Sequence, residues 1–365
     1  MDAALNTMAS AARPSVQPQE LTPIPFEFNG KAWEYFKIWI VNILLTIVTL
    51  GIYSAWAKVR RKRYFYGNTL LRNAPFEYLA EPMQILKGRL IAFGIFVVWA
   101  IAANIFPLLE GLFGLLFVVL VPWLVIRAHA FNSRYSAYRN IRFGFKAGYG
   151  RALGIYIGLP ILAVLTLGLA YPVYSYQRSK FIVANSGYGT APFTFKATVG
   201  NFYVTYIKAA LIVILGMLLI VAIGWFFAAL PQVASGVGLE ANTALGMTSV
   251  FMAIAILGLL LTVRAYVDTQ ITNLVWSNVA TGKNRLRSTL ATPQMLWLYL
   301  SNALAVIFSL GLLIPWAQIR MTRYRLDNLR LLAASELDSF VAKEQEAVAS
   351  AGEEISDFFD IDIGL

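Results

Sequence analysis

Seven apolar segments alternate with polar and mostly basic stretches along the chain. They cover residues 36–57, 90–106, 111–127, 152–174, 204–230, 244–263 and 295–317. Most approach the roughly 20 residues that an α-helix needs to cross the hydrocarbon core of a bilayer. Backbone groups that face lipid must bond within their own segment, so helices are the expected form. The pattern therefore predicts an all-α fold, that of a polytopic helical membrane protein.

One of these apolar segments, together with the basic stretch that follows it, occurs three times. When Gly51, Gly168 and Gly311 are aligned, each glycine has a Thr or Ser two residues before it, a basic residue twelve after it and an asparagine seventeen after it. The basic residues are Arg63, Lys180 and Arg323, and the asparagines are Asn68, Asn185 and Asn328. Internal repeats indicate how a fold is built before they indicate function. This repeat predicts three copies of a glycine-signature membrane element, separated by two transmembrane hairpins.

The repeat divides the chain into seven parts. We expect a disordered leader at 1–25, repeat elements at 26–89, 141–203 and 286–334, transmembrane hairpins at 90–140 and 204–285, and an acidic tail at 335–365. The leader does not resemble a signal peptide, because it lacks a charged segment followed by an apolar run.

Composition supports a place in the bilayer. Hydrophobic residues make up 58% of the chain and charged residues only 13%, whereas about a quarter of an ordinary soluble domain is charged. The net charge of +11 is unevenly distributed, since residues 335–365 hold nine acidic residues and one lysine. Basic residues that flank apolar segments meet anionic lipid headgroups and fix topology, so we expect membrane lipids and no nucleic acid as partners.

Two topologies fit the distribution of Lys and Arg. If all seven segments cross the membrane, Arg178 and Lys180 lie on the opposite side from Arg61 and Arg63, and the repeats are inverted as in many transporters. If the three glycine-signature elements instead enter and return on one side, only the two hairpins span. The loops on the far side, 107–110 and 231–244, then hold no Lys or Arg. The second arrangement obeys the positive-inside rule more strictly.

The repeated element contains the candidate binding residues. We call the repeated cations that follow the apolar segments the basic collar: Arg60, Arg61, Arg63, Lys180, Arg320 and Arg323. They are interpreted either as topology anchors or as a site for lipid phosphate or a protein partner, because guanidinium binds phosphate bidentately. Gly51, Gly168 and Gly311 supply a flexible turn. Asn68, Asn185 and Asn328 are expected to end the basic helices, because Asn tolerates the left-handed conformation.

Two intramembrane amides need a separate explanation. Asn42 and Asn302 lie at the same register, nine residues before Gly51 and Gly311, within apolar runs. Each is expected either to form an interhelical hydrogen bond or to line a polar permeation path.

Catalytic chemistry is not indicated. The chain has one histidine, His129, and no cysteine, so metal sites and disulfides are not expected. Asp268 lies four residues after Arg264, a spacing that predicts a helical ion pair. We expect no enzyme, no catalytic residue, no metal and no cofactor.

The acidic tail has two interpretations. Phe358, Phe359, Ile361 and Leu365 lie among its acids. A solvated disordered tail is one interpretation, and a segment that docks on the basic collar or on a partner protein is the other.

The sequence also resembles a known family. The pattern Phe-x-Phe-x-Gly at Phe26 to Gly30, followed by NILLTIVTLGIYSAWAKVRRKRYFYGNT, is similar to the opening of YjgN-type bacterial inner-membrane proteins, a family named by a domain of unknown function. The resemblance extends over roughly residues 24–333. It implies a multi-pass protein of the bacterial inner membrane, and it suggests a membrane-associated metallopeptidase as a partner. The C-terminal tail is expected on the cytoplasmic side from the distribution of Lys and Arg. The second copy departs from the pattern, with Val173 and Gln177 where the other copies have Trp and Arg.

Two functions follow as hypotheses. The first is a non-enzymatic scaffold or adaptor whose cytoplasmic basic collar binds anionic lipid or a protein. The alternative is a transporter or lipid-handling protein built on inverted repeats.

Overall fold

Short strands lie between the helices and pair into one antiparallel sheet. The computed structural model describes residues 21–105, 107–234, 241–333 and 340–348. The strands are β1 (Thr22–Phe28), β2 (Thr69–Leu71), β3 (Ala74–Tyr78), β4 (Ser136–Tyr138), β5 (Ile141–Phe145), β6 (Ser186–Tyr188), β7 (Ala191–Pro192), β8 (Thr194–Phe195), β9 (Val279–Thr281), β10 (Asn284–Ser288) and β11 (Leu329–Ala333). The all-α prediction is therefore wrong. Part of the predicted leader belongs to β1, and residues 1–20 lie outside the described residues.

The sheet closes on itself. Its order is β7-β6-β5-β4-β3-β2-β1-β11-β10-β9-β8, and the two outermost strands, β7 and β8, are consecutive in the chain with only Phe193 between them. β7 pairs with β6, and β8 pairs with β9. The sheet is therefore a small barrel interrupted only at Phe193, and such closure removes the exposed edges of an open sheet.

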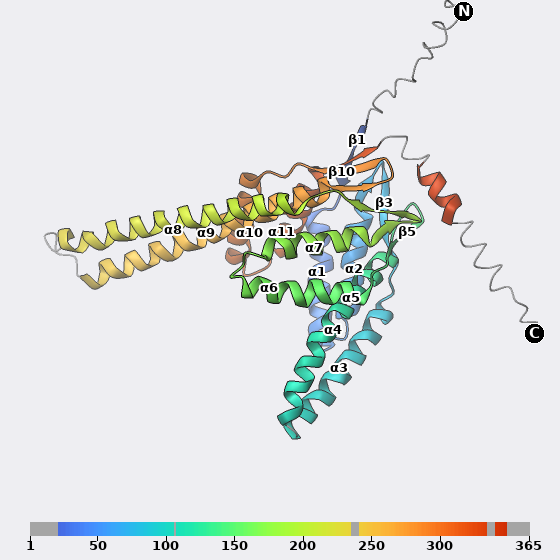
Figure 1. The fold of residues 1–365 in the computed structure, drawn as a ribbon, viewed down its shortest axis with the longest axis horizontal. Coiled ribbons are helices and arrows are strands. Elements are labelled where there is room, and N and C mark those ends of the chain that lie inside the picture. The colour runs from blue at the N-terminus through green and yellow to red at the C-terminus, as the bar shows by residue number, and fades with distance from the viewer. Residues whose placement is uncertain (1–20, 106, 235–240, 334–339, 349–365) are drawn as a thin grey trace, which may run out of the picture.

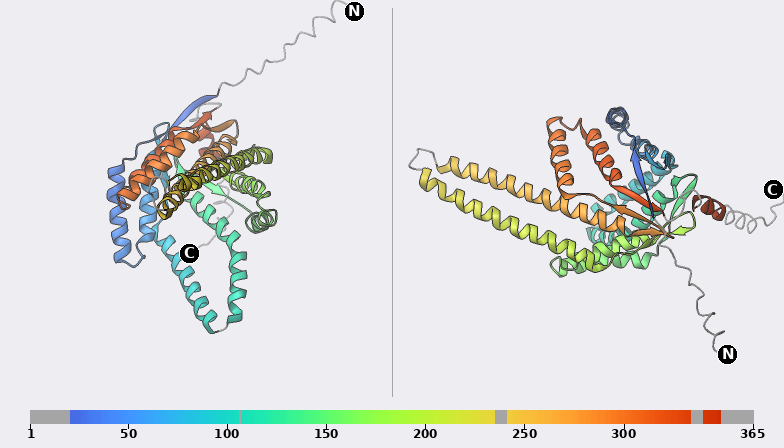
Figure 2. Two further views of the ribbon diagram at one scale, coloured as in Figure 1. Left: turned by 90° about the vertical axis from the view of Figure 1, so that its left-hand side faces the viewer. Right: turned by 90° about the horizontal axis from the view of Figure 1, so that it is seen from above.

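The helices form five hairpins within the described residues. Three are short: α1 (Ala32–Val48) with α2 (Ser54–Gly67), α10 (Thr292–Phe308) with α11 (Ile314–Asp327), and a third whose outgoing arm is α5 (Tyr149–Leu153), the π-helical turn η1 (Gly154–Gly158) and α6 (Leu159–Leu165), and whose return is α7 (Tyr171–Ala184). Two are long: α3 (Pro82–Ile105) with α4 (Pro107–Arg134), and α8 (Val199–Ala234) with α9 (Ala241–Ser277). Figure 2 shows these hairpins arranged around the barrel.

The barrel repeats one unit five times. In each unit a helix leads into two paired strands, and the second strand leads into the next helical hairpin. The backbone N–H of the residue after the second strand donates to the backbone carbonyl of the residue that precedes the first strand of the next unit. The five bonds run from Asn29 to Asn68, Leu79 to Tyr135, Lys146 to Asn185, Lys196 to Asn278 and Thr289 to Asn328, at 2.8–3.0 Å. In the fifth unit the strand pair consists of β11 and β1, so the two ends of the described barrel complete the ring.

All five helical hairpins leave the barrel at the same rim, because the five linking bonds recur at equivalent positions. The inverted-repeat alternative is therefore wrong: the helices that carry Arg61 and Arg178, α2 and α7, end at the same rim of the barrel. The arrangement agrees with the alternative in which the glycine-signature elements enter and return on one side.

Among the described residues, four helices are long and apolar enough to cross a membrane. These segments are Pro82–Ala102, Gly114–Arg134, Val199–Phe226 and Thr248–Ser277, and all belong to the long hairpins. Figure 1 shows the long hairpins leaving the barrel in different directions. The helices of the short hairpins fall below this length: α1 and α10 have 17 residues each, and the apolar helical segment Tyr149–Leu165 is also too short.

Tight turns join the strands in pairs. Arg72 and Asn73 between β2 and β3, and Arg139 and Asn140 between β4 and β5, have φ between 48° and 65°. Two consecutive residues with positive φ form the type I′ turn that matches the twist of a two-residue β-hairpin. The flanking strands have only three to five residues. Such short strands, joined by Arg-Asn turns, cannot be distinguished from basic loops in the sequence, and this is why the all-α prediction missed them.

Candidate functional site

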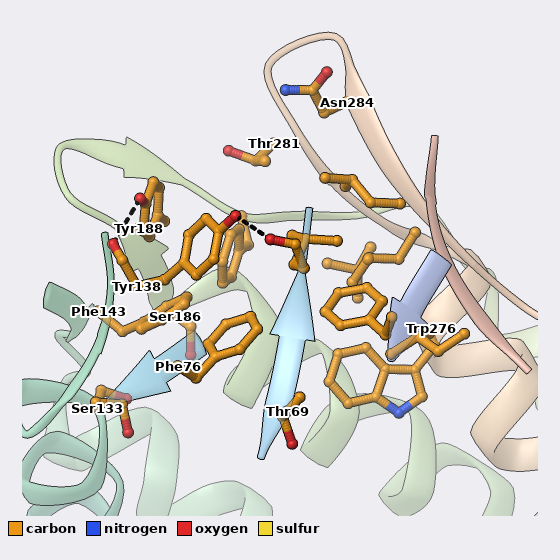
Figure 3. Close-up of a pocket in the computed structure, with 18 of the residues that line it drawn as sticks. Thr69, Phe76, Ser133, Tyr138, Phe143, Ser186, Tyr188, Trp276, Thr281 and Asn284 are labelled. Atoms are coloured by element: carbon orange, nitrogen blue, oxygen red, sulfur yellow. Dashed lines mark hydrogen bonds between the residues drawn. The ribbon is translucent and has the colours of Figure 1, made fainter. Parts of the chain in front are cut away.

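Ten side chains, one from each strand position around the barrel, share its interior. Members on paired strands face each other, as Phe26 faces Leu71 and Phe143 faces Tyr188. Their rings pack closely, with centroids 4.8 Å apart for Phe76 and Tyr138 (Figure 3). We call this set the barrel ring: Phe26, Leu71, Phe76, Tyr138, Phe143, Tyr188, Phe193, Thr281, Leu286 and Leu331. It is the main apolar cluster of the barrel.

A cavity of about 690 Å³ extends from the barrel ring to the last turns of α2, α4, α7, α9 and α11. The first residue of each unit's first strand also lines it, and we call these the rim residues: Thr69, Ser136, Ser186, Val279 and Leu329. Pockets of roughly 300–1,000 Å³ hold drug-sized ligands. The cavity therefore has the size of a binding site, and it reaches the level where the helices leave the barrel.

Most hydroxyl groups around the cavity are already hydrogen-bonded to the protein. Tyr138 donates to the Leu71 carbonyl at 2.7 Å, and Tyr188 donates to the Tyr138 carbonyl at 3.0 Å. Burial raises the pKa of the Tyr188 hydroxyl, so this group stays neutral. Thr281 differs, because its buried Oγ1 has no hydrogen-bond partner. The cavity thus offers aromatic and aliphatic surfaces and an unpaired hydroxyl, a setting suited to an apolar ligand with one polar atom.

A helix at 340–348, which we call the closing helix, covers the end of the barrel away from α8 and α9 (Figure 1). Phe340 stacks on Tyr188 with ring centroids 6.3 Å apart, and Val341 is buried. The buried Glu344 carboxylate accepts hydrogen bonds from the backbone N–H and the hydroxyl of Thr190, both at 2.9 Å. This part of the predicted acidic tail packs on the barrel turns. The tail's terminal hydrophobic residues lie outside the described residues.

A charged pair lies beside the cavity at the helix ends. Arg325, which lines the cavity, bonds to the Asp268 carboxylate at 2.8 Å, and the Tyr299 hydroxyl donates to the same carboxylate. The predicted ion pair of Asp268 with Arg264 is therefore wrong. The partner is Arg325 on α11, 57 residues further along the chain.

The basic collar separates into two kinds of residue. Arg63 donates to the carbonyls of Tyr78 and Ala80 at 3.3 and 3.0 Å, and Arg323 donates to the Gly30 carbonyl at 2.8 Å. Gly30 and Ala80 occupy equivalent positions, two residues after β1 and β3. Each of these two arginines therefore holds its basic helix against the residues that follow a strand, and we call Arg63 and Arg323 the clamping arginines.

The other collar residues have different surroundings and do not hold a helix against the residues that follow a strand. Arg60 reaches the Tyr53 hydroxyl at 3.5 Å, and Arg61 is exposed. Lys180 is also exposed and lies over the Tyr176 ring, while Arg320 donates to Ser301 and Asn302 at 2.6 and 3.2 Å. The structure thus does not gather the collar into a single pocket.

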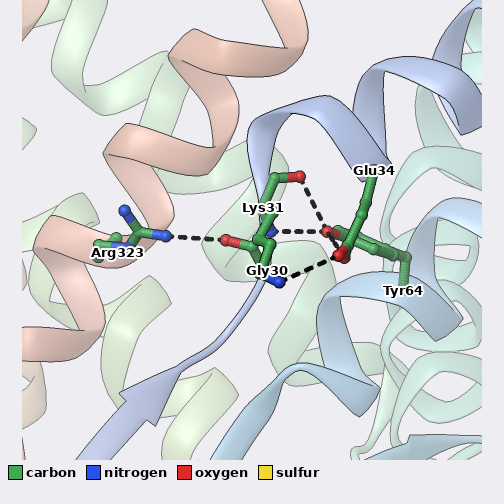
Figure 4. A network of polar contacts seen from close by, with 5 residues as sticks. All are labelled: Gly30, Lys31, Glu34, Tyr64 and Arg323. Carbon is green, nitrogen blue, oxygen red and sulfur yellow. Dashed lines mark hydrogen bonds and ion pairs between the residues drawn. The ribbon is translucent and has the colours of Figure 1, made fainter.

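The tyrosines next to the two clamping arginines have an equivalent role. The Tyr64 hydroxyl accepts from the Lys31 N–H at 2.8 Å and donates to the Lys31 carbonyl at 3.0 Å. The Tyr324 hydroxyl makes the same two bonds with Ala291, at 2.9 and 3.1 Å. Figure 4 shows Arg323 and Tyr64 meeting the chain at Gly30 and Lys31, where β1 leads into α1. The repeated Arg-Tyr pair therefore joins neighbouring units of the barrel.

Asn42 and Asn302 are buried in the short hairpins and do not line the cavity. Asn302 bonds across its hairpin, accepting from Arg320 and donating to the Ala317 carbonyl at 3.5 Å. Asn42 Oδ1 has no partner, because Arg60, the counterpart of Arg320, turns to Tyr53 instead.

The asparagines at the helix ends follow one geometry. Asn68, Asn185 and Asn328 are the C-caps of α2, α7 and α11, and each side-chain amide donates to the carbonyl four residues earlier at 2.7–2.8 Å. Their φ values, between −94° and −99°, show that the expected left-handed conformation is wrong. The bond supplies a side-chain donor to a carbonyl of the last helical turn, where partners within the helix run out. Asn278, which the repeat did not identify, makes the same bond at 2.8 Å.

Metal-binding geometry is not found in the described part of the chain, where no three His, Asp or Glu side chains are grouped. His129 packs against the Phe145 ring, with centroids 5.3 Å apart.

Comparison with known proteins agrees with this membrane architecture. A family described as bacterial protein of unknown function, DUF898, matches residues 23–358. The chain belongs to the DUF898 family. Its relatives include the inner membrane protein YjgN of Salmonella typhimurium strain LT2, 34% identical over 150 residues, which are 40% of this chain and 38% of the relative. YjgN of Escherichia coli K12 is 30% identical over 164 residues, 44% of this chain and 40% of the relative. No solved structure matches.

These relatives confirm the family resemblance, and the matched segments span about two fifths of the length of each relative. With four helices able to cross a membrane, this member of the DUF898 family is a multi-pass protein of the inner membrane.

The sequence of this DUF898 protein did not lead us to predict the barrel ring. A signal for it exists: Thr69, Ser136, Ser186 and Val279 are each followed by ring residues two and seven positions later. Only two of these segments share the Ala-Pro-Phe pattern, and the others differ in almost every side chain. The spacing is therefore visible only once the hairpins are known.

Proposed function

We propose that this protein binds lipid, holding one apolar chain of a membrane lipid in the barrel cavity, and that it performs no chemical reaction of its own. The observation that carries the proposal is the closed barrel with an apolar cavity of about 690 Å³ that reaches the helix ends. The four membrane-competent helices leave the barrel at that same end. A chain entering the cavity therefore has a short path from the bilayer.

The energetics of such binding are favourable. Each methylene moved from water into an apolar site contributes about 0.8 kcal/mol. The aromatic faces of the barrel ring provide the apolar surface, and the unpaired Thr281 hydroxyl offers a hydrogen bond to one polar atom of the ligand. The closing helix blocks the opposite end, so we propose that the ligand enters and leaves between the helix ends.

A second role is supported by the exposed collar residues Arg60, Arg61 and Lys180. Basic residues near a membrane surface attract anionic lipid by about 1 kcal/mol each. We propose that they hold anionic headgroups on the cytoplasmic side, or serve as a docking point for a membrane-associated protein such as the metallopeptidase that the family resemblance suggests. This role is the scaffold hypothesis, and it does not depend on the cavity.

The test of lipid binding narrows the cavity from its rim. Ser186→Phe and Thr69→Phe replace two rim hydroxyls that bond to the carbonyls four residues earlier. Ala184→Phe, an exposed position on α7, is the matched control. Each protein is purified in nanodiscs of phosphatidylethanolamine and phosphatidylglycerol and titrated with a fluorescent long-chain fatty acid.

We expect saturable binding to the unchanged protein and to Ala184→Phe. If each new ring displaces about four methylenes, binding to the rim variants weakens by about 3 kcal/mol, or more than 100-fold. Circular dichroism and thermal unfolding confirm that the variants are folded. The absence of saturable binding to the unchanged protein, or equal binding by both folded rim variants, overturns the proposal.

A further inference from the structure

The tips of the three short hairpins share one turn. Leu50, Leu167 and Leu310 have φ of 49–51°, and the glycine that follows each has φ of 90–92°. The N–H of each glycine bonds to the carbonyl five residues earlier, at 2.7–2.8 Å. This is the 6→1 bond with which glycine-terminated helices satisfy their last carbonyls.

The Thr or Ser before each leucine closes the turn on its other side. The Thr49 hydroxyl accepts from the Tyr53 N–H at 2.9 Å, and the Thr166 and Ser309 hydroxyls accept from Ala170 and Leu313, both at 3.0 Å. The backbone N–H of the residue just before each returning helix therefore has a partner within the turn. Backbone can enter hydrocarbon only where its polar groups are bonded internally. The repeated Thr/Ser-Leu-Gly motif fulfils much of that condition within the tip itself.

The leucines at the tips have no cover from the protein. Leu50, Leu167 and Leu310 are 94–95% exposed, and the apolar residues beside them, such as Val48 and Leu165, are also exposed. Exposed apolar tips of this kind suit acyl chains. The helices long enough to cross a membrane leave the barrel from the same rim as the short hairpins, and this favours lipid as the partner of the tips.

The basic residues limit how deeply the tips reach. Lys58, Arg178 and Arg320 are the first cations after the three leucines, at distances of 8, 11 and 10 residues. At about 1.5 Å per helical residue, these separations are about 12–16 Å. The hydrocarbon core is about 30 Å thick, and any tilt of the helices reduces the depth further. With their cations at the headgroups, the hairpins therefore end near the middle of the bilayer.

We propose that the three short hairpins insert into one leaflet only, the leaflet next to the barrel, with the three leucine tips in contact with its acyl chains. The partner of this surface is the lipid of that leaflet. The inference does not depend on a ligand in the cavity.

The test uses the absence of cysteine in the sequence. Single cysteines replace Leu50, Leu167 and Leu310 and carry a nitroxide label in phosphatidylethanolamine and phosphatidylglycerol vesicles. Ile95→Cys, 66% exposed on α3, is the control for a lipid-facing site, and Arg287→Cys, exposed on β10, is the control for an aqueous site. We expect the tips to match Ile95→Cys in their accessibility to oxygen and to a water-soluble relaxation agent.

Trp33→Cys and Gly67→Cys test whether a short hairpin returns to the side it came from. Both positions are exposed, near the start of α1 and the end of α2. We expect a membrane-impermeant maleimide to label both from the same side, in spheroplasts or in inverted vesicles. Labelling from opposite sides shows a spanning segment and overturns the proposal. Tips as accessible to the water-soluble agent as Arg287→Cys show hairpins lying on the surface and overturn it as well.

Discussion

The two kinds of collar arginine should respond differently when their charge is removed. Arg63 donates to two main-chain carbonyls and Arg323 to one. Arg61 lies on the same helix and is as exposed as Arg63, but it makes no such bond within the described residues. We predict that Arg63→Gln and Arg323→Gln reduce stability, and that Arg61→Gln reduces attachment to anionic lipid without changing stability.

The expected magnitude follows from the bonds. Hydrogen bonds from charged donors contribute about 1.5–3 kcal/mol. Both side chains are partly exposed to solvent, so we expect a loss of about 1–2 kcal/mol for each variant, below that range because of screening. The unfolding entropy is about 2 cal/mol/K per residue, and a chain of this length should therefore lose only about 1–3 °C in Tm for each variant. The two arginines share no partner, so the double variant should lose about 3–5 °C.

Thermal unfolding in detergent, followed by tryptophan fluorescence, measures these shifts. Flotation with vesicles that contain phosphatidylglycerol, at low and high salt, measures attachment to lipid. If Arg61→Gln lowers Tm as much as Arg63→Gln does, or if the double variant unfolds at the original temperature, the division of the collar into arginines with and without main-chain bonds is refuted.

Three further predictions concern single contacts. Burial, with Lys58 and Arg61 nearby, lowers the pKa of Lys62 from 10.5 to about 8; between these values the unfolded chain binds more protons, so stability should rise from pH 8 to 10.5 and be lowest below 8. Lys62→Met should raise Tm at pH 7 and flatten the rise of stability between pH 8 and 10.5. An unchanged dependence of stability on pH would contradict the lowered pKa of Lys62. Glu344→Ala leaves the Thr190 N–H without its acceptor, at a cost of about 1–3 kcal/mol, so hydrogen exchange at Val341 should accelerate while the exposed Lys343→Ala leaves it unchanged. Asp268→Asn should lower Tm because Arg325 loses its counter-charge, and the double variant with Arg325→Gln should be less destabilised than the single one; equal or greater loss in the double variant counts against the pair.

Membrane character, family and the three related turns could be read from the sequence, because each depends on residues close together in the chain. A run of apolar residues gives a helix whatever its neighbours are. Thr49, Leu50 and Gly51 form their turn from local bonds. The alignment also found Arg63 and its counterpart Arg323, although their bonds to main-chain carbonyls needed the positions of Ala80 and Gly30.

The barrel could not be read in this way, because each of its strands depends on a distant partner. Thr22 pairs with Ala333, and Phe195 pairs with Val279. A three-residue strand such as Ser136–Tyr138 has no period long enough to distinguish it from a loop. The hydrophobic pattern of the sequence is set by the long helices and the repeats. The short strands between them have the composition of basic loops. The cavity was missed for the same reason, since its lining comes from all five units.

The pairing of β1 with β11 has a consequence for biosynthesis. The ribosome synthesises β1 first and β11 last among the strands, so the ring of strands cannot close until nearly the whole chain has emerged. By then the long hairpins α3–α4 and α8–α9 have already been made and can have entered the membrane. Until closure, β1 and the strands already formed expose unpaired edges, which are sites of aggregation. Anchoring by the first long hairpin keeps this unfinished sheet at the membrane surface, where the completing strand arrives on the same polypeptide.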